Sequence, residues 1–176
     1  ELRDLETADI ASQASLTGHL VFSTLHTNDA PGSVSRLLYL GVPPYLVNSS
    51  LLAVVAQRLV RRLCPSCREP HAAEPAELAR YGLAEGLPAG AMLHRALGCP
   101  ECQQTGHAGR VGIYEILEVD DKVKDQITRR ASSSRIKKTA IDRGTLTTLR
   151  QDAVGKALRG LTSLAEVDRV THRDIG

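Results

Sequence analysis

Aromatic side chains are almost absent from this sequence: they make up 3% of its 176 residues, with one Phe and no Trp. Proteins that hold single-stranded nucleic acid stack its bases on exposed aromatic rings, so this scarcity argues against such a role. An excess of one charge is also missing, because 22 basic residues stand against 20 acidic ones and leave a net charge of +2. This balance argues against a nucleic-acid partner and against direct binding to an acidic membrane surface.

Long apolar runs and a secretory leader are missing as well. No run approaches the roughly 18 apolar residues that a membrane-spanning helix needs. Residues 1–4 are mostly charged, unlike a signal peptide, and the chain lacks an initial Met, so we expect a part of a longer protein. The apolar residues are mostly Leu, Val, Ile and Ala, which predicts an aliphatic core.

The order of the patterned segments predicts an α/β protein. Residues 19–25 form a short, nearly continuous apolar run after a Thr-Gly turn signal, which is typical of a strand buried on both faces. Residues 64–112 are rich in Cys, Pro, Gly and charge, and we interpret them as a separate small module. This interpretation divides the chain into three predicted parts, residues 1–63, 64–112 and 113–176. The other predicted strands are 57–63 and 111–119, and the predicted helices are 4–15, 28–41, 45–56, 121–128, 134–143, 147–160 and 163–171.

All four cysteines fall in two Cys-x-x-Cys pairs. Each pair offers two thiolates from one tight turn, and two such turns complete the tetrahedron that Zn²⁺ accepts. Two disulfides are the alternative, but they persist in oxidising compartments, and nothing in the sequence indicates export. Four thiolates close the coordination shell, so the zinc would be structural and not catalytic. The predicted ligands are Cys64, Cys67, Cys99 and Cys102.

The predicted strand 19–25 begins with His19 and leads into His26, Thr27 and Asn28. Ligands of open α/β sheets bind at the carboxyl ends of strands, which is where these polar residues would lie. A histidine there can donate to a phosphate oxygen or relay a proton near neutral pH. The alternative, left open by the chemistry alone, is that His26 only caps the next helix.

Motifs along essentially the whole chain resemble the ATPases of type II secretion and type IV pilus assembly. The two cysteine pairs belong to the pattern, and they favour the secretion or pilus-extension branch over the retraction branch. The other segments that carry the resemblance are residues 1–8, 14–19, 23–28, 56–61, 106–115 and 160–171.

The resemblance implies the C-terminal half of a RecA-like P-loop NTPase domain, followed by the zinc module and a helical C-terminal subdomain. Glu1 matches the glutamate that polarises the water attacking the γ-phosphate of ATP. His19 and His26 match the histidine box that couples nucleotide state to domain motion. The family also implies ATP and Mg²⁺ as ligands, a hexameric ring and a cytoplasmic location. The ring would bind integral platform proteins of the inner membrane and no nucleic acid.

A phosphate-binding loop, Gly-x-x-x-x-Gly-Lys-Ser/Thr, does not occur in these 176 residues. Because phosphoryl transfer depends on such a loop for positioning and charge stabilisation, we expect the chain alone not to hydrolyse ATP. The alternative hypothesis is a non-enzymatic zinc-binding interaction module. An isolated half-sheet would expose strand edges and apolar faces, which counts against that alternative.

Overall fold

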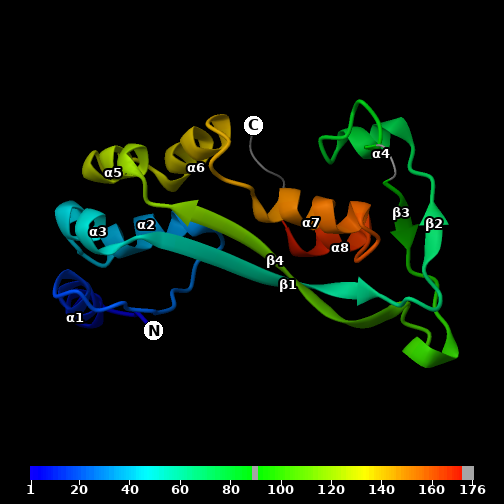
Figure 1. The fold of residues 1–176 in the computed structure, drawn as a ribbon, viewed down its shortest axis with the longest axis horizontal. Helices are drawn as coiled ribbons and strands as arrows, with labels where there is room; N and C mark the ends of the chain where they lie inside the picture. The colour runs from blue at the N-terminus through cyan, green and yellow to red at the C-terminus, as the bar shows by residue number, and fades with distance from the viewer. Residues whose placement is uncertain (89–90, 172–176) are drawn as a thin grey trace. The chain divides into compact units, whose positions relative to one another are not determined.

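The structure is a computed structural model that describes residues 1–88 and 91–171 (Figure 1). It contains helices and strands in mixed order, which confirms the α/β prediction. The strands β1 (Ala53–Leu63) and β4 (His107–Glu118) pair with each other. The chain divides into two compact units, and both strands run from one unit into the other. The first unit is Glu1–Ala56 with Glu115–Thr147, and the second is Gln57–Tyr114 with the described residues from Thr148 onward.

The helices of the first unit, except α3, begin at side chains that accept backbone N–H groups. Asp4 accepts from Thr7 N–H at 2.8 Å, and Asp120 accepts from Val123 N–H at 2.9 Å. Such caps satisfy donors that the first turn leaves without a partner, and each is worth about 1 kcal/mol. The helices are α1 (Leu5–Leu16), α2 (Ala30–Tyr39), α3 (Pro44–Ser50), α5 (Asp121–Thr128) and α6 (Ser133–Asp142).

Aliphatic side chains fill the core of the first unit, as the composition predicts. Val34 of α2, Ile127 of α5 and Ile136 of α6 are completely buried, and Leu117 of β4 joins them. Burying each such side chain contributes about 1.5–3 kcal/mol, so this cluster dominates the stability of the unit. Among residues 1–88 and 91–171, none of the helices has both the length and the hydropathy of a membrane span.

The predicted strand at residues 19–25 is wrong for this structure. The segment contains no assigned strand, and Leu20 and Phe22 are 72% and 88% exposed. Among the described residues its backbone makes two bonds to other segments: Thr24 O accepts from Leu2 N–H, and His19 N–H donates to Ala14 O. A strand buried on both faces needs hydrogen-bonded neighbours and covering helices. The apolar run alone therefore does not make the segment a strand.

The predicted helix 45–56 is too long. Helix α3 ends at Ser50, since Leu51 adopts an extended conformation with ψ 117°. Leu52 O then accepts from Val119 N–H at 2.9 Å, and β1 begins at Ala53. Val54 and Val55 favour the pleated conformation because their branched side chains pack well there. Tertiary pairing thus converts the end of an apolar run from helix to strand.

The second unit contains a small two-stranded sheet and two packed helices. Strand β2 (Glu69–His71) pairs antiparallel with β3 (Leu93–Arg95), and Pro70 lies opposite His94. Thr148 begins α7 with a capping box to Gln151. The four helices predicted after residue 120 are confirmed within a few residues. The helical elements of this unit are α4 (Pro75–Ala79), the 3₁₀ helix η1 (Pro100–Cys102), α7 (Leu149–Leu158) and α8 (Leu164–Val170).

Candidate functional site

The first cysteine pair follows the end of β1. Of the second pair, Cys99 is the N-cap residue of η1 and Cys102 is its last residue. Cys64 N–H donates to Gly106 O at 3.0 Å, which holds the two turns together. Gly106 has φ +70°, and a Cβ there would lie 2.6 Å from the Cβ of Ala96. The turn after η1 therefore requires glycine for both its backbone conformation and its close approach.

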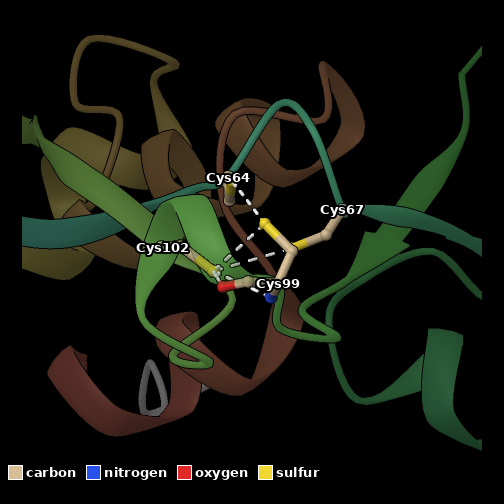
Figure 2. Close-up of side chains that lie close together, drawn as sticks. All are labelled: Cys64, Cys67, Cys99 and Cys102. Carbon is tan, nitrogen blue, oxygen red and sulfur yellow. Dashed lines mark hydrogen bonds between the residues drawn. The ribbon is translucent and has the colours of Figure 1, made fainter.

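The four sulfur atoms converge between these turns (Figure 2). The Sγ distances are 3.9 Å for Cys64–Cys99, 3.8 Å for Cys67–Cys102 and 3.7 Å for Cys99–Cys102. A tetrahedral zinc with Zn–S bonds of about 2.3 Å requires sulfur atoms about 3.8 Å apart. All four cysteines are free thiols, so the structure favours a metal cluster over the disulfide alternative. The predicted convergence of the four cysteines is confirmed.

Backbone N–H groups surround the sulfur atoms, as thiolate ligands require. Cys102 Sγ accepts from Cys99 N–H and from Gly106 N–H, each at 3.2 Å, and Cys67 Sγ accepts from Gly98 N–H at 3.3 Å. Burial opposes the charge of Cys102, but hydrogen bonds from these N–H groups and from the neighbouring thiols outweigh it and lower the pKa of the Cys102 thiol to about 6. Burial and the neighbouring thiols raise the pKa of the Cys67 thiol to about 11, so without a metal the negative charge concentrates on Cys102. The donor set and its hydrogen bonds therefore fit a four-thiolate metal.

A second group of side chains lies in the first unit. His26 Nε2 is 2.9 Å from Glu1 Oε1, and Arg3 donates to Glu1 Oε2 at 2.7 Å. The hydrogen bond from Arg3, with a smaller contribution from His26, lowers the pKa of the Glu1 carboxyl. The side chains of His26 and Arg3 are 89% and 75% exposed, so these pairs add little stability. Together with Leu2 and Arg36 they line a cavity.

His19 lies apart from this pair. Its Nδ1 is 3.1 Å from Thr17 Oγ1 and 3.2 Å from Ala14 O, at the C-terminal end of α1. No hydrogen bond or ion pair among residues 1–88 and 91–171 joins His19 to Glu1 or His26. Of the three residues that the resemblance assigns to the nucleotide site, the structure brings together Glu1 and His26.

The structure buries two carboxylates to which the sequence analysis gave no role. Glu166 of α8 accepts from the backbone N–H of Arg61 at 2.9 Å and pairs with the side chains of Arg61 and Arg169. Glu115 of β4 accepts from Ala30 N–H at 2.8 Å. Their relative exposure is 1% each. Position 115 follows a strand pattern in which alternate residues face inward, and this alternation is the signal that could have identified its burial.

Two solved structures share the fold of this chain. The pilus retraction motor PilT with bound ADP superposes with a TM-score of 0.61 at 21% identity, covering 97% of this chain and 38% of the other. The Legionella pneumophila ATPase DotB superposes with a TM-score of 0.59 at 20% identity, covering 97% and 37%. At these identities the likeness establishes the fold alone.

The sequence identifies the family more closely. The profile of the family described as "Type II/IV secretion system protein" matches residues 1–169, and the chain therefore belongs to this family. It is 49% identical to type II secretion system protein E of Pseudomonas aeruginosa over 99% of this chain and 34% of that protein. It is 50% identical to type II secretion system ATPase E of Vibrio cholerae over 97% and 33%. The type IV pilus assembly ATPase PilB of Thermus thermophilus is 46% identical over 95% and 19%.

The chain spans about a third of the length of the type II secretion relatives it matches. The matched part covers nearly all of the chain itself. The family match likewise extends over residues 1–169.

Proposed function

We propose that this chain is the C-terminal portion of an oligomeric ATPase that powers protein secretion through a type II system or assembly of a type IV pilus. The observation that carries the proposal is the 49% identity to type II secretion system protein E across 99% of the chain. An identity of 50% to a protein named as an ATPase supports the enzymatic part. The 46% identity to a pilus assembly ATPase supports the pilus alternative.

The proposed fold is the C-terminal half of a RecA-like P-loop NTPase domain with a tetracysteine module and a helical C-terminal subdomain. The division into residues 1–63, 64–112 and 113–176 stays a prediction. We further propose a hexameric ring on the cytoplasmic face of the inner membrane, bound there through integral platform proteins. The solved motor and ATPase folds support the general architecture.

Glu1 and His26 are the proposed catalytic pair, with His19 as a second coupling residue. Bound ATP and Mg²⁺ would supply the reactive phosphate and the charge that polarises it. The Glu1 carboxylate, held anionic by Arg3, would orient and polarise the attacking water. His26 lies 2.9 Å from that carboxylate, so a change at the nucleotide site would shift His26. The residues between His26 and α2 would transmit this shift to the helix.

The cysteine cluster is proposed to hold a structural Zn²⁺ through Cys64, Cys67, Cys99 and Cys102. With four thiolates the shell has no open position, so this metal would stabilise the second unit without joining the chemistry. A module with so small an apolar core gains its folding free energy from such a metal. Metal analysis of the purified protein would identify the ion.

Magnesium-dependent ATP turnover by the full-length protein tests the enzymatic proposal. Replacing Glu1 by Gln should lower kcat by at least about a hundredfold, since general acid–base and water-positioning groups typically contribute that much. The matched control is Glu6→Gln, an exposed glutamate in the first turn of α1, which should retain wild-type turnover. Absence of turnover in the full-length protein would refute the ATPase proposal. Turnover by the 176-residue chain alone would refute the requirement for a phosphate-binding loop.

A further inference from the structure

Glu115 is a carboxylate in a position where β4 otherwise buries aliphatic side chains. On the same face of the strand, Ile113 and Leu117 are 0% and 1% exposed, and Glu115 is 1% exposed. Burying a carboxylate costs several kcal/mol unless hydrogen bonds and an opposite charge offset the loss of water. An aliphatic residue would avoid that cost, whereas the buried carboxylate needs interactions that compensate for it.

The first of these interactions is a hydrogen bond at the start of α2. The first helical residue, Ala30, is completely buried, and its N–H donates to Glu115 Oε1 at 2.8 Å. Pro31 has no N–H, and the N–H of Gly32 donates to Asp29 Oδ1 at 2.9 Å. Glu115 thus accepts a hydrogen bond from Ala30 N–H, the donor that the N-cap residue Asp29 does not reach. A neutral acceptor would serve that donor equally well, so this contact does not explain the charge.

The charge is explained by Lys137 of α6. Its Nζ lies 3.6 Å from Glu115 Oε2 and 3.5 Å from Asp29 Oδ2. The Lys137 side chain is 24% exposed, so water screens these attractions less than on an open surface. One ammonium group therefore bridges the two carboxylates that hold the first turn of α2.

The turn held in this way is continuous with the segment that carries His26. Thr27 Oγ1 lies 2.7 Å from Ser33 Oγ, which ties the residue after His26 to the second turn of α2. Asp29 follows two residues later. A change in the position of this first turn must therefore move the backbone of His26, whose imidazole contacts Glu1.

We infer that Glu115 and Lys137 are positioning residues that set the place of His26 through the first turn of α2. The inference rests on the proposed function, in which His26 belongs to the nucleotide site. It places two residues that affect the site on β4 and α6, well separated in sequence from Glu1 and His26. Both residues contact the start of α2 and act on the site through this helix terminus.

The test uses the full-length protein with Glu115→Gln, which keeps an acceptor for Ala30 N–H but removes the charge that faces Lys137. We expect kcat to fall about tenfold with the KM for ATP changed less than about twofold, because small displacements of catalytic groups affect the chemical step most. In the His26→Ala background the same substitution should have no further effect on kcat. Lys137→Met should behave like Glu115→Gln in both backgrounds.

The matched control is Glu166→Gln, which also replaces a buried carboxylate that accepts a backbone N–H. The effects of Glu166→Gln and His26→Ala on kcat should be independent, so that their fold-changes multiply, because Glu166 lies in the second unit. A second measurement is the ¹³Cε1 resonance of His26 in histidine-labelled protein, which Glu115→Gln should shift and Glu166→Gln should not. An unshifted resonance, or a Glu115→Gln effect that multiplies with His26→Ala, would overturn the inference. If the wild-type protein lacks ATP turnover, the proposed function fails, while the His26 resonance still decides the positioning role.

Discussion

The imidazole Nε2 of His26 lies 2.9 Å from the carboxylate oxygen Oε1 of Glu1, although helix α1 separates the two residues in the sequence. The backbones of the two segments also meet, since Leu2 N–H donates to Thr24 O at 2.9 Å. The contact contributes little to stability because the imidazole is 89% exposed. Its significance lies in the chemistry that a carboxylate and an imidazole at hydrogen-bond distance can share.

Removing this imidazole should lower ATP turnover. We expect His26→Ala in the full-length protein to reduce kcat by at least about tenfold, the lower range for a group that assists proton transfer or positions a reactant. His71→Ala is the control, because His71 lies on β2 beside Glu77 in the second unit. Steady-state kinetics would check both variants, and equal activity of His26→Ala and wild type would contradict the assigned role.

Loss of a single thiolate should release the metal. Cys102→Ser removes the sulfur that accepts two backbone N–H groups, and we expect bound zinc to fall from about one equivalent to near zero. Elemental analysis measures this directly. Ser66→Ala, in the turn between Cys64 and Cys67, should retain the metal.

Amide hydrogen exchange should show which part of the protein loses protection when the metal is removed. A chelator should increase amide exchange around the two cysteine turns in the second unit, since their hydrogen bonds depend on fixed sulfur positions. The core of the first unit, including Val34 and Ile136, should keep its protection. Uniform loss of protection in both units, or none in either, would contradict a local structural role for the metal.

Glu166 should make the second unit sensitive to acid. Burial opposes its charge, but hydrogen bonds from Arg169 and Arg61 outweigh it and lower its pKa from 4.5 to about 2. A pKa lowered in the folded state adds stability above pH 4.5, and that stability is lost as the pH falls toward 2. The shift corresponds to up to about 3 kcal/mol, because the two arginines are half exposed and partly screened.

The measurement is the free energy of unfolding from pH 2 to 7 for wild type and Glu166→Gln. The variant should be about 2–4 kcal/mol less stable at pH 7 and should lose less stability on acidification, since the titrating group is gone. Glu118→Gln, an exposed glutamate of β4, should leave the profile unchanged. Parallel profiles for wild type and Glu166→Gln would show that this carboxylate does not carry the acid sensitivity.

A Cβ at Gly106 should destabilise the cysteine turns. Gly106→Ala combines a left-handed φ of +70° with a contact of 2.6 Å to Ala96, so we expect a loss of about 2–4 kcal/mol. Gly109 has φ +75° and nothing within 4 Å of its Cβ position, so Gly109→Ala should lose only about 1 kcal/mol. Thermal unfolding compares the two, and equal losses would assign the whole effect to the backbone angle.

Local sequence determined the features that depend on neighbouring residues. The two Cys-x-x-Cys pairs are set by tight turns, and their convergence was predictable because thiolates at that spacing share one metal. Helices after residue 120 were predictable for a similar reason, since Asp120, Ser132, Thr148 and Ser163 each accept an N–H of the first turn. The aliphatic core followed from composition.

Tertiary structure decided the features that depend on distant partners. Residues 19–25 are mostly apolar, yet a strand forms only where neighbouring backbone groups offer hydrogen bonds, and the sequence pattern does not contain that information. The same reason explains why the end of the predicted helix 45–56 became part of β1. Glu115 and Glu166 are buried because Ala30, Lys137, Arg61 and Arg169 meet them from other elements. A charge is acceptable in a core only with such partners, and only the folded chain brings them together.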